Sequence, residues 1–353
     1  MVHVRVTLWR NEVRLARVIG ASAQRHEHRS RLYLCVEHEG VAGYGEVSPQ
    51  PFALHGDPSV DEVVQELVDV VVPRLIEMQE REGEVASWTR IARIAGPRPA
   101  SASAVALVEM AVLDRELRIT GTNARDLWPR VYDTPVQTTV SALGRGTSWR
   151  VDPGAARVRV KCAPGALDAL ALERLGRLET PVLLDFNCSA DDPEDVLSLV
   201  RQVARVVHVD AVEQPFGPGN VIDHALLAPR LDCGLSIDEG VRSIRDVEHL
   251  AQYRAATMIC VKPARVGGLA NARTIIARAL ELSLRVYLGG FFESRYARGV
   301  HRQLAEHSLA EASDLGAVEL VDDRLEVVEA PHGFALAPSA EILAHSSVIA
   351  EWC

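Results

Sequence analysis

Five charged residues recur at nearly constant spacing in the second half of this chain, each at the end of a short apolar run. They are Lys161, Asp185, Glu213, Asp238 and Lys262, and successive members lie 24, 28, 25 and 24 residues apart. The runs before them, such as 157–160, are rich in Val, Leu and Ile. Strands that recur at this spacing with helical stretches between them predict a parallel α/β fold.

The number of apolar runs narrows the fold class further. From about residue 134, candidate strands alternate with amphipathic helical stretches, and the strands span 136–142, 157–161, 181–185, 207–213, 234–238, 257–262, 284–288 and 315–320. They are apolar on both sides of the pleat, as buried parallel strands are. Eight such strands predict a modified (β/α)8 TIM-type barrel, and a doubly wound sheet is the competing architecture.

The first part of the chain has a different pattern. Alternation at 2–9 and 31–37 predicts antiparallel strands, whereas the polar stretches 20–30 and 49–58 lack periodicity and predict loops. Helical spacing follows Ser59, a good N-cap residue. An Ala-, Leu- and Val-rich run predicts a second, largely buried helix over 101–117.

These patterns predict two domains. An α+β capping domain would comprise residues 1–128, and the barrel domain would comprise 129–320. The tail, 321–353, contains short strand-like runs at 325–328 and 334–336, and we expect it to return to the capping domain.

Charge and cysteine content restrict the classes of function. The formal net charge of −10 argues against general binding to nucleic acid or to anionic membranes. No apolar run approaches the length of a membrane span, and no secretory leader follows Met1. The six cysteines are scattered without a C-x-x-C pair, which predicts reduced thiols and a cytoplasmic protein.

Catalytic groups of a parallel barrel lie where the strands run out into the following loops. A single charge there is ordinarily solvated, but five in register predict one site. The carboxylates of Asp185, Glu213 and Asp238 would repel one another unless a hard cation joined them. Oxygen ligands suit Mg²⁺, with Mn²⁺ as a substitute, and the absence of His and Cys at these positions disfavours zinc.

Such a metal would bind a substrate carboxylate and stabilise the enediolate that forms when the α-proton leaves. A base is then required on one face of the substrate. Lys161 is the candidate, because Arg159 lies on the same side of the strand and its positive charge would lower the lysine pKa. Lys262, three strands further on, would approach the opposite face as a second acid or base, or as a cation beside the intermediate.

Several motifs resemble those of the enolase superfamily, muconate-lactonizing subgroup, over most of the chain. The matching segments are Arg159-Val160-Lys161 (K-x-K), Asp185-Phe186-Asn187 (D-x-N), Glu213-Gln214-Pro215 (E-Q-P), Asp238-Glu239-Gly240 (D-E-S), 262–268 (K-P-x-R-x-G-G), Gly43-Tyr44-Gly45-Glu46 (G-W-G-E) and 109–114 (E-x-A-x-x-D). The resemblance implies Asp185, Glu213 and Asp238 as metal ligands, with Arg159, Asn187 and Glu239 in supporting roles.

Within that subgroup, the chain most resembles the o-succinylbenzoate synthases and N-succinylamino acid racemases. The segment 289–294 resembles the start of their G-G-M-x-E-[ST] motif, which implies supporting or substrate-contacting roles for Gly290, Glu293, Ser294 and Arg295. Phe291 replaces the methionine and Arg295 replaces a glycine, so we expect a smaller pocket. The acid-rich motif of dipeptide epimerases is missing around 316–319, which disfavours that activity.

The resemblance implies an enzyme that dehydrates its substrate as o-succinylbenzoate synthase does, a lyase reaction. An N-acylamino acid racemase or a cycloisomerase would use the same residues. A barrel that has lost its chemistry and binds a ligand is the alternative from another class, and retention of both lysines and all three acids argues against it. The expected partners are a small-molecule carboxylate substrate and, as in the family, further copies of the chain in a homo-oligomer.

Overall fold

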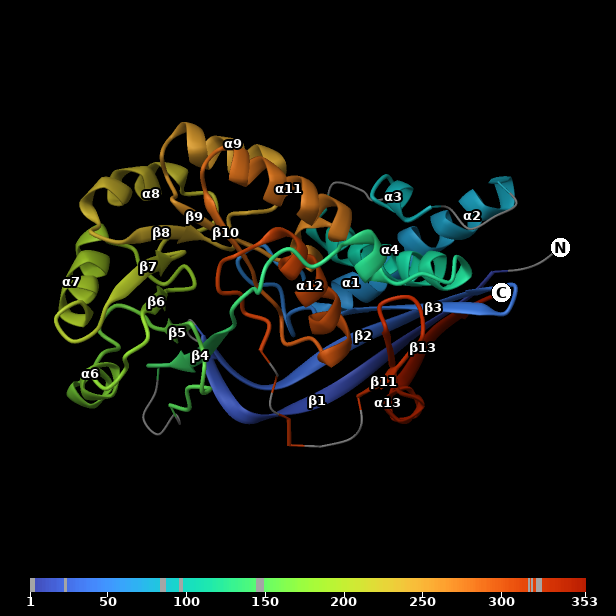
Figure 1. Ribbon diagram of the computed structural model, residues 1–353, viewed down its shortest axis with the longest axis horizontal. Coiled ribbons are helices and arrows are strands. Elements are labelled where there is room, and N and C mark those ends of the chain that lie inside the picture. Colours follow the sequence, from blue (N-terminus) through green and yellow to red (C-terminus); the bar gives the residue numbers. More distant parts are fainter. Residues whose placement is uncertain are drawn as a thin grey trace.

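The computed structural model describes residues 4–21, 24–82, 87–94, 98–143, 149–316, 318, 320–321 and 326–353. Two large sheets organise this part of the chain: a curled parallel sheet and a long antiparallel sheet (Figure 1). None of the described helices is both long and apolar enough to cross a membrane.

The parallel sheet has seven strands, and its order follows the sequence from β4 to β10. They are β4 (Gln137–Ser141), β5 (Arg157–Lys161), β6 (Val182–Asp185), β7 (Val209–Glu213), β8 (Gly234–Ile237), β9 (Met258–Val261) and β10 (Arg285–Leu288). Each interior strand of this run is hydrogen-bonded to its neighbours in sequence, and all pairs are parallel. This topology confirms the predicted barrel-type α/β fold and excludes the doubly wound order, in which the strand sequence reverses.

Helices follow the strands from β5 onward, and the longer ones between strands lie along the outside of the curled sheet (Figure 1). They are α6 (Ala169–Leu175), α7 (Pro193–Val203), α8 (Val221–Leu227), the 3₁₀ turn η2 (Ala228–Arg230), α9 (Ile244–Gln252), α10 (Pro263–Val266), α11 (Leu269–Glu281) and α12 (Arg295–Ser308). Side-chain caps begin several of them. Asp168, for example, accepts a hydrogen bond from the Ala171 amide at the start of α6.

The predicted eighth strand over 315–320 is not a strand in its described residues, and residues 317 and 319 lie outside the description. The chain meets both edges of the sheet slightly earlier. Ser313 forms a parallel bridge with Val136 beside β4, and the Asp314 amide donates to the Leu288 carbonyl of β10 at 2.9 Å. Three backbone hydrogen bonds, made by Ser313 with Pro135 and Gln137 and by Asp314 with Leu288, therefore join the edges where a full ladder was expected.

The antiparallel sheet has the order β13-β1-β2-β3. Its strands are β1 (Arg5–Ala21), β2 (Gln24–His38), β3 (Val41–Val47) and β13 (Ser347–Trp352). The loop predicted over 20–30 is therefore wrong, since β2 begins at Gln24 and pairs with β1, with His28 opposite Arg14. The segment is rich in polar residues and shows no alternation with apolar ones, so only the ladder with the neighbouring strand reveals the strand.

The helical elements of the first part are α1 (Val60–Glu66), the π-helical turn η1 (Leu67–Val71), α2 (Val72–Glu82), α3 (Trp88–Ile91), α4 (Pro99–Ile119) and α5 (Ala124–Leu127). Of these, α4 packs on β2 and β3 of the sheet, and α1, η1 and α3 pack on α4 (Figure 1). Ser59 forms the predicted cap, in a reciprocal capping box with Glu62. Helix α4 lies so close to β3 that a Cβ atom at Gly45 would stand 2.2 Å from the Leu107 carbonyl oxygen.

The end of the chain lies beside its beginning. Strand β13 pairs with β1, placing Trp352 opposite Val6. Before it come β11 (Val327–Glu329), β12 (Leu336–Pro338) and α13 (Ala340–Ala344). Strands β11 and β12 pair with each other and not with the larger sheet. Leu325, the first residue of the strand predicted at 325–328, lies outside the described residues.

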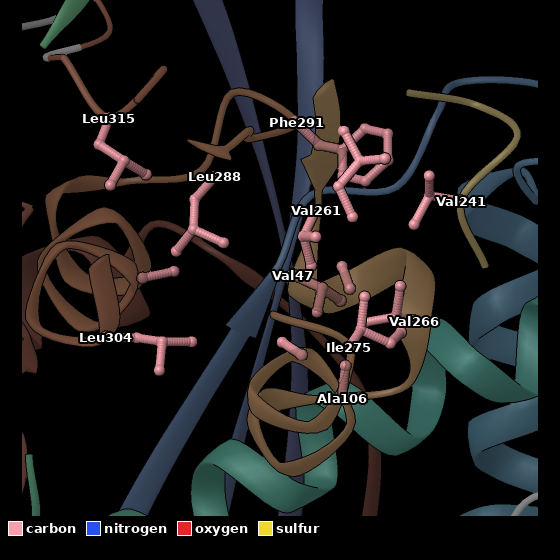
Figure 2. Packing of buried hydrophobic residues seen from close by; sticks show 14 of the residues in the cluster. Val47, Ala106, Val241, Val261, Val266, Ile275, Leu288, Phe291, Leu304 and Leu315 are labelled. Carbon is pink, nitrogen blue, oxygen red and sulfur yellow. The ribbon is translucent and has the colours of Figure 1, made fainter. Parts of the chain in front are cut away.

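One apolar core runs through both parts of the molecule. Figure 2 shows Val47 of β3 and Ala106 of α4 beside Val261, Val266 and Ile275 of the barrel. Burial of apolar side chains across this boundary favours a fixed placement of the antiparallel sheet over the strand ends. The residues at those ends are thus covered by a second layer.

Candidate active site

The parallel register brings the five strand-end charges to one mouth of the barrel. Lys161 is the Cα partner of Asp185, and Asp185 is the partner of Glu213. Asp238 directly follows β8, and Lys262 follows β9 at the N-terminus of α10. All five are buried, with no more than 9% of any of these residues exposed. Charges at this depth need partners, and the structure supplies them.

Lys161 is held by one side-chain oxygen at the end of β6 and one just after that strand. Its Nζ donates to Asp185 Oδ2 at 2.5 Å and to Asn187 Oδ1 at 2.8 Å. The Asn187 side-chain amide in turn donates to Glu239 Oε1 at 3.0 Å. Asn187 has a positive φ of 44°, so the chain turns sharply after β6 and brings this amide back over the strand end. Asn187 and Glu239 thus form a chain of hydrogen bonds that leads to Lys161.

Lys262 lies at the far end of the same arc. Its Nζ donates to Asp238 Oδ2 at 2.8 Å and stands 4.6 Å from the centre of the Phe291 ring. Burial alone would lower the pKa of this lysine, but the Asp238 carboxylate outweighs that effect and raises it above the ordinary value. Lys262 is therefore a buried ammonium with an anion on one side and an aromatic face on another.

Arg159 extends among the three acids. Its Nε lies 2.7 Å from Asp185 Oδ2, and its Nη2 contacts Glu213 Oε1 and lies 3.3 Å from Asp238 Oδ2. The remaining nitrogen, Nη1, lies 3.1 Å from Asp314 Oδ2. Despite its burial, these carboxylates raise the pKa of Arg159 well above the ordinary value, so the guanidinium is fully charged.

The three acids differ in their electrostatic surroundings. Although burial opposes it, positive neighbours hold the pKa of Asp185 below its ordinary value and that of Asp238 well below it. Burial dominates at Glu213 and raises its pKa to about 8. Glu213 also accepts a hydrogen bond from the Tyr287 hydroxyl at 2.6 Å.

The donor set suits a hard divalent cation. Glu213, Asp238 and Cys260 each place a ligand atom within 4.8 Å of the others, and Asp185 stands on the adjacent strand. Carboxylate oxygens are the donors that Mg²⁺ and Mn²⁺ prefer, whereas the Cys260 sulfur is a soft donor. Burial raises the pKa of this thiol well above its ordinary value, so Cys260 stays protonated and adds no charge to the cluster.

Arg265 and Asp57 belong to the same network but were not among the predicted site residues. Arg265 Nη1 donates to Asp238 Oδ1 at 2.5 Å, while its Nε and Nη2 hold both Asp57 oxygens at 2.8 and 2.7 Å. Arg265 lies in the K-P-x-R-x-G-G segment, so the motif contained its signal. Asp57 lies in a polar loop of the first part, where nothing in the sequence separates it from its neighbours.

The residues predicted after β10 separate into two groups. Glu293 and Ser294 are buried: Glu293 accepts from the Phe291 amide at 2.7 Å, and Ser294 donates from both its amide and its hydroxyl to Glu46. Gly290 lies against Glu293, 2.6 Å from Oε2 at the place of a Cβ. Arg295, in contrast, is exposed at the start of α12.

The Phe291 ring lies beside Lys262, with its centre 4.6 Å from Nζ. Its ring centre also lies 5.1 Å from the Arg265 guanidinium carbon. Two buried arginines of β2 hold this segment from the other side. Arg29 donates to the Phe291 carbonyl and Arg31 donates to the Phe292 carbonyl, each at 3.1 Å. The antiparallel sheet thus fixes the backbone that places Phe291.

Comparison with known proteins shows the family of this chain. Residues 149–339 match the family model described as enolase C-terminal domain-like. An o-succinylbenzoate synthase of Listeria innocua is 28% identical over 285 residues, which cover 76% of this chain and 72% of that protein. An N-succinylamino acid racemase of Thermus thermophilus is 24% identical over 290 residues, covering 78% and 75%.

Solved structures show the same fold. An enolase-superfamily protein from Listeria innocua superposes with a TM-score of 0.83 at 20% identity, covering 100% of this chain and 98% of that one. A muconate lactonizing enzyme from Pseudomonas fluorescens gives 0.80 at 19% identity, covering 97% and 98%. Both antiparallel and parallel sheets therefore have counterparts in these proteins.

Proposed function

The chain belongs to the enolase C-terminal domain-like family, and from that premise we propose that it removes the proton α to a carboxylate and dehydrates its substrate as an o-succinylbenzoate synthase does. One observation carries the proposal. Lys161 and Lys262 stand at opposite ends of an arc whose middle strands present the carboxylates of Asp185, Glu213 and Asp238. A small carboxylate bound over these acids would have an amine on each side.

The acids would hold a divalent cation, Mg²⁺ or Mn²⁺ in its place. That cation would supply the positive charge that stabilises the substrate carboxylate as negative charge develops on it. The protein residues supply the remaining steps. The neutral amine of Lys161 would take the α-proton, the C–H electron pair would form the new double bond, and hydroxide would leave the β-carbon as water with the proton that Lys161 returns.

Lys262 would remain a cation in this reaction. Its hydrogen bond to Asp238 and its position under the Phe291 ring suit a fixed ammonium group. Asn187 and Glu239 position Lys161, because Asn187 accepts a hydrogen bond from the lysine and donates one to Glu239. The cytoplasmic location and the homo-oligomeric state remain expectations from the sequence.

Racemisation of an N-acylamino acid is the second candidate. The two-sided arrangement of lysines supports it, because each amine could remove or return a proton on its own face. Curated relatives of both kinds, synthase and racemase, match this chain. The two candidates share the first proton transfer. They differ at Lys262, which only supplies positive charge in the dehydration but must exchange a proton in the racemisation.

Solvent exchange tests the common step. The protein should incorporate deuterium from ²H₂O at the α-carbon of its substrate in the presence of Mg²⁺, and EDTA should abolish the exchange. The panel comprises the o-succinylbenzoate synthase substrate and N-succinylamino acids, with Lys161→Met as the inactive control. Ligand binding without exchange across the panel, unaffected by EDTA, would instead favour a binding protein.

Lys262→Arg separates the two candidates. A dehydration in which position 262 supplies only charge should keep much of its rate, because arginine retains the positive charge. A two-base racemisation should collapse, since arginine does not exchange protons at neutral pH. Equal collapse of both activities would contradict the role proposed for Lys262.

A further inference from the structure

Arg159 fills the space between the acids that would hold a cation. Its guanidinium reaches Asp185, Glu213 and Asp238 together, and its side chain is only 2% exposed. The chain has arginine where the family motif has lysine. A planar guanidinium presents donors in several directions at once, so one arginine can span acids that a single ammonium could not.

The charge of the three acids is already matched by protein groups. Asp185 contacts Lys161 as well as Arg159, and Asp238 contacts Lys262 and Arg265. Glu213 has Arg159 as its cationic partner and the Tyr287 hydroxyl as its second donor. Buried carboxylates without such partners would strongly destabilise the fold.

The positions of the ligand atoms are consistent with a guanidinium between them. In the described part of the chain, the group whose ligand atoms lie within 4.8 Å of one another contains Glu213 and Asp238 but not Asp185. Direct ligation by Mg²⁺ needs oxygens about 2.0–2.1 Å from the ion. Asp185 must therefore draw closer to the other two acids when it joins them as a ligand.

We propose that Arg159 is a built-in counter-ion which competes with the divalent cation for these three carboxylates. Metal binding then requires the guanidinium to withdraw from Asp185, Glu213 and Asp238. The withdrawn guanidinium can stay paired with Asp314, whose Oδ2 lies 3.1 Å from Nη1. The metal-free protein stays folded because Arg159 takes the place of the ion. This inference rests on the metal site of the proposed function.

Arg157 provides a matched control. It lies on the same strand, two residues earlier, and is equally buried. It donates to Asp210 at 2.9 Å, to Gln137 Oε1 at 2.9 Å and to the Ala312 carbonyl at 2.6 Å. Its guanidinium also lies 4.7 Å from the centre of the Tyr287 ring, but none of its hydrogen bonds or ion pairs reaches the three acids. Arg157→Lys therefore removes a buried guanidinium from β5 while every direct contact between Arg159 and the three acids stays in place.

The test measures Mg²⁺ and Mn²⁺ binding to metal-free wild type, Arg159→Lys and Arg157→Lys, by calorimetry and by manganese EPR. Arg159→Lys should bind both ions about tenfold more tightly than wild type, and Arg157→Lys should not differ from it. Melting temperature gives an independent readout. Without metal Arg159→Lys should melt below wild type, and saturating Mg²⁺ should raise its melting temperature more than that of wild type.

Equal or weaker metal binding by Arg159→Lys would overturn the inference, while α-proton exchange by wild type with Mg²⁺ would leave the proposed function standing. Binding by Arg159→Lys but not by wild type would support the inference and contradict the proposed function. Absence of binding in all three proteins, together with absence of exchange, would overturn both.

Discussion

At the scale of single residues, the site depends on close approach between side chains of neighbouring strands. Gly289, at the end of β10, shows this most directly. A Cβ atom there would stand 2.6 Å from Cys260 Sγ and 2.9 Å from Lys262 Cε. The position needs glycine for space, since both neighbours belong to the site or adjoin it. The stem of Lys262 packs against this glycine.

Gly289→Ala should displace Lys262 while the fold survives. Because a misplacement of about 1 Å can cost on the order of 100-fold in rate, we expect a loss of that size in α-proton exchange. Gly217→Ala is the control, since nothing lies within 4 Å of a Cβ at that position. Rates are measured in ²H₂O and melting temperatures by circular dichroism; unchanged exchange in Gly289→Ala would contradict the packing argument.

At the scale of elements, two acids of α4 join this helix to the barrel, to β3 and to the C-terminal segment. Glu109 of α4 accepts hydrogen bonds from the amides of Leu269 and Ala270 at the start of α11. Asp114, one turn further along α4, accepts from the Tyr44 and Phe334 amides at 2.9 and 3.0 Å. The E-x-A-x-x-D segment is therefore a joint between elements, with its acids outside the strand-end cluster.

Glu109 should make stability depend on pH. Burial raises its pKa to about 8 from an ordinary 4.5, although the two amides oppose the shift. The folded state therefore holds a proton that the unfolded state releases, so this stabilisation is full below about pH 4.5 and falls as the pH rises towards 8. The loss is at most about 1.4 kcal/mol per pH unit within that window.

Urea unfolding of wild type and Glu109→Gln between about pH 5 and pH 8 measures this effect. Glutamine does not titrate, so the stability of wild type should fall relative to that of the variant as the pH rises. Glu80→Gln, an exposed change on α2, should track wild type throughout. Parallel curves for Glu109→Gln and wild type would contradict the role assigned to Glu109.

At the scale of the whole molecule, a buried ion pair joins the loop after β3 to the mouth of the barrel. Asp57 pairs with Arg265 through two hydrogen bonds, and Arg242 adds a third contact at 3.0 Å. Arg265 also holds Asp238. The docking of the first part of the chain is thus linked through one side chain to an acid of the site. Although burial opposes it, the arginines hold the pKa of Asp57 below its ordinary value.

Asp57→Asn should loosen this docking. Removing one partner of a buried pair leaves the other uncompensated, and we expect a loss of unfolding free energy on the order of 2–4 kcal/mol above the ordinary Asp pKa. The difference should shrink as wild type is acidified through the lowered pKa of Asp57. Asp61→Asn, which breaks a solvent-exposed pair with Arg10, should cost about 0–1 kcal/mol. Equal losses in the two variants would contradict the linkage.

The sequence by itself determined the strand ends and their charges, because parallel strands separated by helices repeat at a regular spacing and end in the same place. Lys161, Asp185, Glu213, Asp238 and Lys262 were found in this way, and their convergence follows from the register. The sequence did not reveal the start of β2 in the β1–β2 hairpin. Its polar residues show no alternation, and the hydrogen bonds that define the strand are made with β1.

Only the tertiary structure decided which groups surround those charges. Asp57 comes from a loop more than 180 residues before Asp238 in the chain, and Asp314 comes from the far edge of the curled sheet. From the sequence, Arg159 is expected to lie beside Lys161 and to lower the pKa of that lysine. The structure places its guanidinium between the three acids, because the curvature of the parallel sheet turns side chains of β5 towards those of β7 and β8.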